Sequence, residues 1–231
     1  MRLRGVVFDM DQTLYDRPAS DRIAMARYFA DQRERFAETC TEGMAIESMV
    51  RADHDEGHFG WNRILSRMVE DGIFRSPPET ADICAFFQKE FSLEGVLFPS
   101  TKQTLKELKE LGLSVAMITN GNEQSQMKKI RGLGIEECFD RIIVGSDIET
   151  RKPNKAIFLE MADNLHAKPE ELLYVGDNPL NDVQGARDAG YVPVWIATMP
   201  WDYPEIEKAP YTIFQIEEIV PLARMLLKGQ K

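Results

Sequence analysis

The sequence has no long hydrophobic run, little cysteine and no excess of positive charge. No stretch approaches the ~18 consecutive apolar residues of a membrane-spanning helix, so we expect no membrane partner. The net charge of −10 argues against DNA or RNA as a partner, because phosphate contacts need a basic surface, but it is compatible with a small anionic substrate. Cys40, Cys84 and Cys138 form no CxxC pair, which predicts reduced thiols. The N-terminal apolar run ends at Asp9, too early for a signal peptide, and we expect a cytoplasmic protein.

The 231 residues are enough for one large core and a small accessory domain. Two different hydrophobic patterns divide the chain. Between residues 18 and 93, apolar residues such as Met25, Phe29 and Phe36 follow helical spacing without strand-like alternation, which predicts an all-helical insert. From Pro99 onward short apolar strands alternate with helices, which predicts a parallel sheet covered on both faces. The expected strands are 3–8, 114–118, 141–144, 172–175, 191–196 and 211–214, and the expected helices are 101–111, 124–132, 154–166, 181–189 and 216–227.

Polar residues follow three of these strands. Asp9 and Asp11 come after the first strand, Thr119 follows strand 114–118, and Asp177 follows strand 172–175. Ligands bind at the carboxyl ends of strands in sheets of this kind, so we expect these side chains on one rim.

The aspartates at this rim, with Asp182 added, would repel one another without a counter-charge. A divalent cation removes the repulsion, and oxygen ligands with a substrate phosphate suit Mg²⁺. The chain has no cluster of His and Cys that would favour Zn²⁺. The sequence therefore predicts a site for Mg²⁺ and a phosphate.

Chemical roles follow from these positions. Asp9 ends a rigid strand and is placed to attack phosphorus as a nucleophile. Asp11, two residues on, falls on the same side of an extended backbone, where it would protonate the leaving oxygen and then deprotonate water.

The remaining polar residues of the rim fit supporting roles. Thr119 and Lys152, which precedes a helix, would hold the phosphoryl oxygens. Asp177 would bind the metal, and Asp182 would orient a metal-bound water or Lys152.

The four segments resemble, in order and spacing, the four motifs of the haloacid dehalogenase superfamily of hydrolases. The matching residues are Asp9 to Leu14 (DxDx[TV]), Thr119-Asn120 after a strand, Lys152-Pro153 before a helix, and Gly176 to Asp182 (GDxxxxD). The resemblance implies an α/β, Rossmann-like core over residues 1–14 and 96–231. It also implies a small helical cap over residues 15–95, inserted after the first motif.

The resemblance also assigns ligands. It implies that Mg²⁺ binds the Asp9 carboxylate, the Asp11 backbone carbonyl and Asp177. The residues that would bind phosphate are Met10 and Asp11 through backbone N–H groups, together with Thr119, Asn120 and Lys152.

The predicted function is Mg²⁺-dependent hydrolysis of a small phosphorylated metabolite through an aspartyl-phosphate. A phosphomutase, which returns the phosphoryl group to a sugar, carries the same motifs and stays an alternative, as does a non-catalytic binding domain that kept the fold. Two other branches fit less well. Dehalogenases lack the counterpart of Asp11, and transport ATPases carry Lys-Thr-Gly after the nucleophile, where this chain has Met10-Asp11-Gln12.

The predicted cap is the expected source of substrate specificity, since the core motifs account only for phosphate and metal. It holds nine of the sixteen arginines and one of the twelve lysines, and arginine suits anionic groups. Its sixteen acidic residues offer a plainer role for those arginines as surface ion-pair partners. The candidate specificity residues are Arg22, His54, His58, Trp61 and Arg63.

Overall fold

A computed structural model describes residues 2–57, 60–147 and 149–229. The chain divides into two compact units, one formed by Met1–Asp16 with Leu97–Lys231 and the other by Arg17–Val96. No helix among the described residues is long and apolar enough to cross a membrane.

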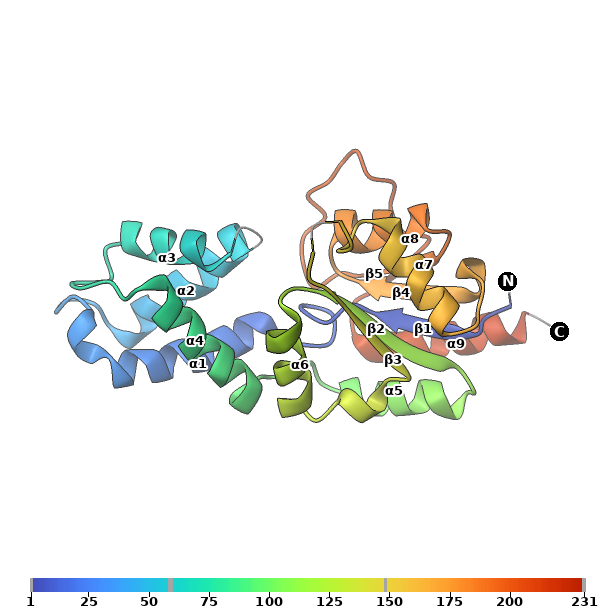
Figure 1. Ribbon diagram of the computed structural model, residues 1–231, viewed down its shortest axis with the longest axis horizontal. Coiled ribbons are helices and arrows are strands. Elements are labelled where there is room, and N and C mark those ends of the chain that lie inside the picture. Colours follow the sequence, from blue (N-terminus) through green and yellow to red (C-terminus); the bar gives the residue numbers. More distant parts are fainter. Residues whose placement is uncertain (1, 58–59, 148, 230–231) are drawn as a thin grey trace. The chain divides into compact units, whose positions relative to one another are not determined.

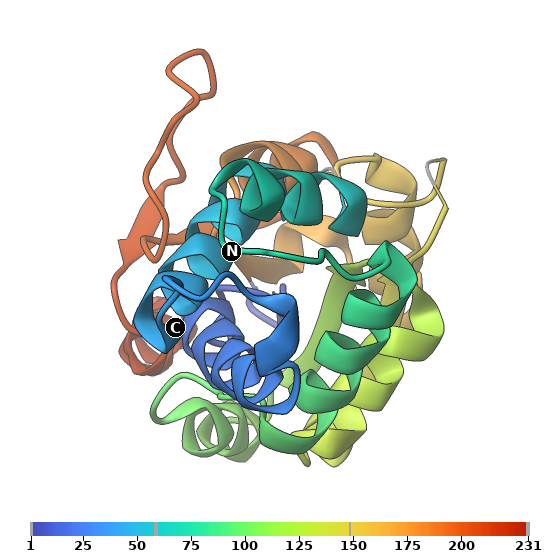
Figure 2. The same cartoon turned by 90° about the vertical axis from the view of Figure 1, so that its left-hand side faces the viewer.

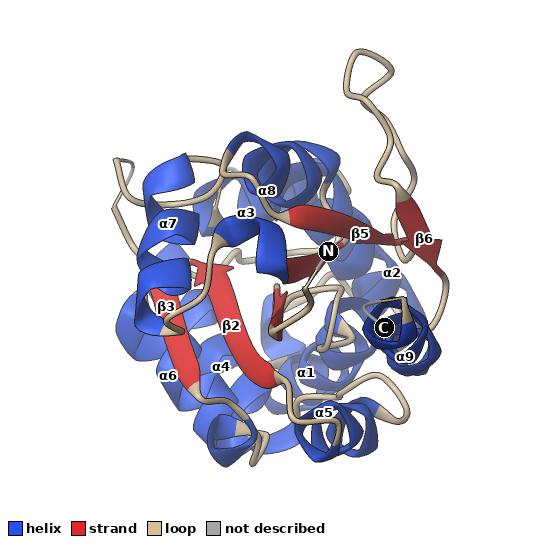
Figure 3. Ribbon diagram, turned by 90° about the vertical axis from the view of Figure 1, so that its right-hand side faces the viewer, coloured by secondary structure: helices blue, strands red, loops and turns tan. Residues whose placement is uncertain are grey.

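The larger unit is built on a six-stranded parallel sheet, as the alternation of strands and helices predicts (Figure 3). The strand order is β3-β2-β1-β4-β5-β6, so β1 lies between β2 and β4. The strands are β1 (Gly5–Phe8), β2 (Ser114–Asn120), β3 (Arg141–Gly145), β4 (Leu172–Gly176), β5 (Val192–Ile196) and β6 (Tyr211–Ile213). Both β1 and β4 are fully buried, which explains why they read as continuous apolar runs.

Helices cover both faces of this sheet, which confirms the predicted α/β class. Figure 1 shows α7 and α8 on one face and α5 and α9 on the other. The helices are α5 (Thr101–Glu110), α6 (Glu123–Gly132), α7 (Lys155–Asn164), α8 (Gly185–Asp188) and α9 (Ile219–Lys228). Val7, Ile118, Phe158 and Tyr174 belong to one buried cluster that packs α7 against the sheet.

Asparagines begin three of the turns that lead away from the strands. At the start of the expected helix 154–166, Asn154 accepts the Ala156 N–H at 2.9 Å, and Asn122 accepts the Ser125 N–H at 3.0 Å. Asn178 accepts the N–H of Asn181 at 2.8 Å, in a π-helical turn over Pro179–Gln184. Each cap satisfies backbone donors that would otherwise lack a partner at a helix start.

Two elements differ from expectation. Strand β2 continues through Asn120, so Thr119 lies inside the strand. The expected helix 181–189 is instead the π-helical turn, which begins at Pro179, followed by the short α8. Asp182 folds back in this turn to accept the Asn178 N–H at 2.9 Å. Gly176 leaves room for it, since a Cβ there would lie 2.4 Å from the Asp182 side chain.

The smaller unit is helical, as predicted for the insert (Figure 2, blue to green). Its helices are α1 (Arg17–Asp31), α2 (Glu42–Glu56), α3 (Trp61–Glu70) and α4 (Thr80–Glu94). They enclose their own apolar core, in which Met25, Met49, Met68 and Phe87 are fully buried. This unit therefore has the packed interior that an independent domain needs.

Candidate active site

The predicted catalytic residues of the first, second and fourth motifs meet at the carboxyl edge of the sheet. Asp9 follows the central strand β1, and its backbone N–H donates to the Val175 carbonyl of β4 at 2.9 Å. Asp177 follows β4, and Thr119 lies in β2 on the other side of β1. Three segments far apart in sequence therefore come together because their strands are neighbours.

Three buried carboxylates form the centre of the site. Asp9, Asp177 and Asp182 each offer an oxygen, and these oxygens all lie within 4.8 Å of one another. Asp182 Oδ1 accepts the Lys152 ammonium and its Oδ2 accepts the Asn178 N–H, so protein donors occupy both oxygens. Asp9 and Asp177 are consequently better placed than Asp182 to contact a cation.

Lys152 is the buried cation of the cluster, with 3% of its side chain exposed. Its Nζ donates to Asp9 Oδ1 at 2.6 Å, to Asp182 Oδ1 at 2.7 Å and to the Tyr174 hydroxyl at 2.9 Å. Asn120 positions this lysine: the Lys152 N–H donates to Asn120 Oδ1 at 2.9 Å, and Asn120 Nδ2 donates to the Lys152 carbonyl at 3.0 Å. The Asn120 side chain is thereby committed to the Lys152 backbone, and its contact with phosphate stays a prediction.

Burial dominates the electrostatics of the site. It raises the pKa of Asp9 to about 7, with Lys152 opposing this rise and Asp182 adding to it. Burial, followed by the charges of Asp182 and Asp9, also raises the pKa of Asp177 well above its ordinary value. Burial alone would lower the pKa of Lys152, but Asp182 and Asp9 together hold it well above its usual range.

Three carboxylates surround one lysine in this cluster, so the cluster has more acidic groups than its lysine can balance. A cation beside Asp9 and Asp177 would supply the missing positive charge. The donors are carboxylate oxygens, which suit a hard divalent ion. The residues present therefore fit Mg²⁺.

Asp11 points to helix α6, where sequence reasoning placed no functional residue. Lys129 Nζ donates to Asp11 Oδ1 at 2.7 Å, and Gln126 Nε2 donates to Asp11 Oδ2 at 3.1 Å. Gln126 also donates to Thr119 Oγ1 at 3.0 Å. The available signal was the i, i+3 spacing of Gln126 and Lys129, which puts both on one helix face together with buried Ile130.

Two further residues of the site lie on the strands and escaped the sequence analysis. The buried Tyr174 of β4 donates to the Ile118 carbonyl at 3.1 Å and accepts from Lys152. Trp195 of β5 donates its Nε1–H to the Asp177 carbonyl at 2.8 Å. Aromatic residues in buried strands look like ordinary core, so their polar ends give no signal in the sequence.

The candidate specificity residues lie in the smaller unit. Arg22 pairs with Glu47, Arg63 forms a two-point ion pair with Glu56 at 3.0 and 3.1 Å, and His54 contacts Asp55 at 2.9 Å. Trp61 packs against Phe87 in the apolar core of this unit, with ring centres 4.9 Å apart. His58 lies outside the described residues.

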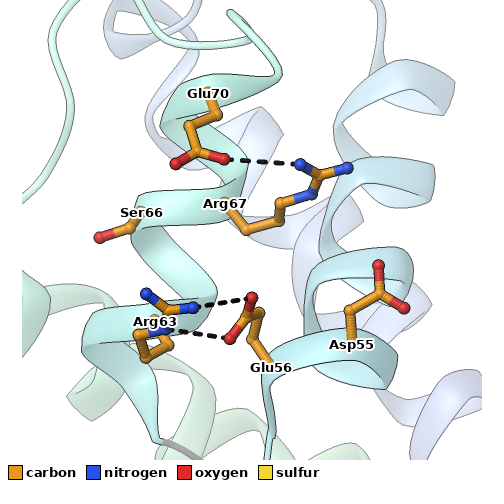
Figure 4. A pocket seen from close by; sticks show the side chains of 6 residues that line it. All are labelled: Asp55, Glu56, Arg63, Ser66, Arg67 and Glu70. Carbon is orange, nitrogen blue, oxygen red and sulfur yellow. Dashed lines mark hydrogen bonds and ion pairs between the residues drawn. The ribbon is translucent and has the colours of Figure 1, made fainter.

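A polar hollow of about 310 Å³ lies within the smaller unit, between α2 and α3 (Figure 4). It is lined by Asp55, Glu56, Arg63, Ser66, Arg67 and Glu70. Arg63 pairs with Glu56 along its wall, and Arg67 pairs with Glu70 at 3.4 Å. The charges that line the hollow are thus largely balanced against one another.

Comparisons with known proteins agree with this geometry. A family model described as haloacid dehalogenase-like hydrolase matches residues 3–190. The glyceraldehyde 3-phosphate phosphatase of Methanocaldococcus jannaschii is 28% identical over 98% of this chain and 99% of its own, and the N-acylneuraminate-9-phosphatase of mouse is 27% identical over 84% and 83%. Among solved structures, the hydrolase YfnB of Bacillus subtilis, bound to magnesium, has a TM-score of 0.77 at 24% identity and covers 96% of this chain and 99% of its own.

Proposed function

The chain belongs to the haloacid dehalogenase-like hydrolase family and is a phosphoric monoester hydrolase, and we propose that it hydrolyses a small phosphorylated metabolite through an aspartyl-phosphate on Asp9. The observation that carries this proposal is the position of Asp9. Asp9 directly follows the central strand β1, and its Oδ1 accepts from Lys152 Nζ at 2.6 Å. The proposed location is the cytoplasm, in keeping with the three free cysteines.

The first half of the reaction forms the covalent intermediate. An Asp9 carboxylate oxygen attacks phosphorus, and the bond from phosphorus to the leaving oxygen breaks. Asp11 gives its proton to that oxygen, so the product leaves as an alcohol. Lys152 and Thr119 stabilise the phosphoryl oxygens as charge develops on them, together with the backbone N–H groups of Met10 and Asp11.

The second half returns the enzyme to its starting state. Asp11, now a carboxylate, takes a proton from a water molecule that attacks phosphorus. The bond between phosphorus and Asp9 breaks and releases inorganic phosphate, while Asp11 regains its proton.

Mg²⁺ would be held by the carboxylates of Asp9 and Asp177 and by the Asp11 backbone carbonyl. When bound, it neutralises charge on the carboxylates and the phosphoryl group and thereby allows two anions to approach each other. Asp182 positions Lys152, whose Nζ donates to Asp182 Oδ1 at 2.7 Å. We expect excess EDTA to abolish turnover and Ca²⁺ to inhibit, because Ca²⁺ takes more ligands at longer distances than Mg²⁺.

The smaller unit is proposed to act as a cap that selects the leaving group and excludes water during the reaction. The curated relatives named above are phosphatases of different small metabolites, which supports a substrate of that size. The leading candidate substrates are therefore phosphorylated trioses and phosphorylated sugars.

A panel of phosphorylated metabolites, assayed for released phosphate with Mg²⁺ and with EDTA, tests the proposal. Hydrolysis of a small phosphomonoester that requires Mg²⁺ and disappears in Asp9→Asn supports it. Transfer of the phosphoryl group to a second sugar phosphate instead of water would identify a phosphomutase. Undiminished turnover in excess EDTA, or phosphopeptides as the best substrates, would overturn it.

A further inference from the structure

Helix α6 contributes a buried cation that the proposed mechanism has not used. Only 7% of Lys129 is exposed, whereas the neighbouring Lys128 is exposed. Its ammonium lies 2.7 Å from Asp11 Oδ1 and 4.6 Å from the centre of the Tyr15 ring. A buried ammonium needs an oxygen that accepts its hydrogen bond, and Asp11 Oδ1 supplies one.

Gln126 contacts the same carboxylate on its other oxygen. The residue is 8% exposed, and Nε2 lies 3.1 Å from Asp11 Oδ2, 3.0 Å from Thr119 Oγ1 and 2.9 Å from the Asn120 carbonyl. Gly121 gives this side chain room, because a Cβ at that position would lie only 3.2 Å from it. Gln126 therefore links Asp11 to the strand that carries Thr119.

The two contacts together define how Asp11 is oriented. One oxygen is bound by a charged donor and the other by a neutral donor, and both donors stand one helical turn apart on a rigid element. A carboxylate that moves a proton must be held within a few tenths of an ångström of its productive position. Asp11 itself stands directly before the turn at residues 12–14.

We propose that Lys129 and Gln126 are positioning residues that hold the Asp11 carboxylate for proton transfer, an inference that rests on the acid–base role proposed for Asp11. Neither residue contacts Asp9 in the hydrogen bonds and ion pairs of the described residues. Lys129 acts through Asp11, and Gln126 acts through Asp11 and Thr119. An ion pair on the open surface would have no such effect, but the side chains of Lys129 and Asp11 are only 9% and 23% exposed.

The consequence is a kinetic signature shared with Asp11. Proton donation matters for an alkyl leaving group, whereas p-nitrophenolate leaves without a proton. kcat/KM reports the steps up to phosphorylation of Asp9, and kcat also includes the attack of water. Loss of Asp11 function should therefore lower kcat/KM for alkyl phosphates alone, but lower kcat for both substrate classes.

The test compares Lys129→Met, Gln126→Leu, Asp11→Asn and the double variant of Asp11→Asn with Lys129→Met. Lys128→Met, next to Lys129 but exposed, is the matched control, and thermal melting of each variant checks folding. The substrates are p-nitrophenyl phosphate and the alkyl phosphate that the wild-type enzyme hydrolyses fastest.

We expect Lys129→Met to lower kcat/KM for the alkyl phosphate by about 10- to 100-fold, a fraction of what general acid–base catalysis supplies, and to change it less than about threefold for p-nitrophenyl phosphate. Gln126→Leu should show the same pattern more weakly and keeps the test decisive if Lys129→Met does not fold. The double variant should be no slower than Asp11→Asn, because residues that act as a unit are not additive.

Two results have distinct meanings. If Asp11→Asn lowers kcat/KM equally for both substrates, the acid–base role in the proposed function is wrong. The positioning role alone is overturned if Asp11→Asn lowers kcat/KM only for the alkyl phosphate, but Lys129→Met and Gln126→Leu lower kcat/KM equally for both substrates. It is also overturned if the losses in the double variant are fully additive.

Discussion

The two units of the molecule use charge in opposite ways. In the larger unit, Lys152 and Asp182 pair with 3% and 2% of their side chains exposed. In the smaller unit, Arg22 and Glu47 pair with 47% and 63% exposed. The first pair belongs to a network that includes Asp9 and Tyr174, whereas the second stands on the surface.

This difference is the one expected between a candidate active site and an exposed surface. Charges removed from water cost free energy that only close partners offset, so a buried network of this kind marks a candidate functional site. Exposed ion pairs contribute little to the free energy of unfolding, and most arginines of the smaller unit form pairs of this type. Changes to the two kinds of pair should consequently differ in size.

The largest effect should come from Asp9→Asn, which removes the proposed nucleophile. An amide cannot form the acyl-phosphate, so we expect phosphate release to fall below detection while the fold is kept. Steady-state release by purified protein, with melting curves beside it, measures both. Asp163→Asn on the exposed face of α7 is the control. Wild-type release by Asp9→Asn would refute the covalent role.

Lys152→Met should have the largest effect on stability. It leaves Asp9 and Asp182 buried without their cation, which costs about 3–5 kcal/mol of unfolding free energy when one partner of a buried pair is removed. Urea unfolding of the metal-free protein measures this. Lys155→Met, at an exposed position three residues later, should stay within about 0.5 kcal/mol of wild type. Equal values for the two variants would show that the buried network does not stabilise the larger unit.

The next effect is the dependence of Mg²⁺ binding on pH. Burial raises the pKa of Asp9 to about 7 from an ordinary 3.8, so below pH 7 the folded, metal-free protein holds a proton that the unfolded chain has lost. This group therefore favours the folded state increasingly as pH falls from 7 towards 4, and a cation must displace its proton. The Kd for Mg²⁺ should rise about tenfold per pH unit below 7 for each proton displaced.

Tryptophan fluorescence offers a direct way to follow this binding, because Trp195 donates to the Asp177 carbonyl. Trp195 also makes an edge-to-face contact with Trp201, with ring centres 5.0 Å apart. Titrations of Mg²⁺ at pH 6, 7 and 8 give the Kd without any turnover. A Kd that is the same at all three values would contradict the raised pKa of Asp9.

The smallest effects should come from the smaller unit. Arg22→Ala and Arg63→Ala each break an exposed pair and should change stability by about 1 kcal/mol or less. If this unit is the cap, such changes should alter kcat/KM differently for different leaving groups and leave p-nitrophenyl phosphate nearly unchanged. Equal losses for every substrate would argue against a role in specificity for these two arginines.

The sequence predicts the parallel sheet and the residues at its carboxyl edge, because short apolar strands alternate with helices along the chain. Short apolar runs locate the strands, and the strand ends locate Asp9 and Asp177, because a parallel sheet brings its carboxyl ends to one edge. Gln126, Lys129 and Tyr174 were not foreseen. Gln126 and Lys129 lie on helix α6, and Tyr174 lies on strand β4. The polar groups that these side chains contact are set by tertiary packing, which no local sequence pattern encodes.

The covalent role of Asp9 is tested most directly by trapping the intermediate. Asp11→Asn, mixed with p-nitrophenyl phosphate and Mg²⁺ and quenched in acid, should accumulate a phosphorylated enzyme, because the first step then needs no proton while the second step lacks its base. Peptide mass spectrometry should place the phosphoryl group on Asp9. A trapped phosphate on any other residue, or turnover by Asp11→Asn with no phosphorylated enzyme during a single turnover, would contradict the mechanism.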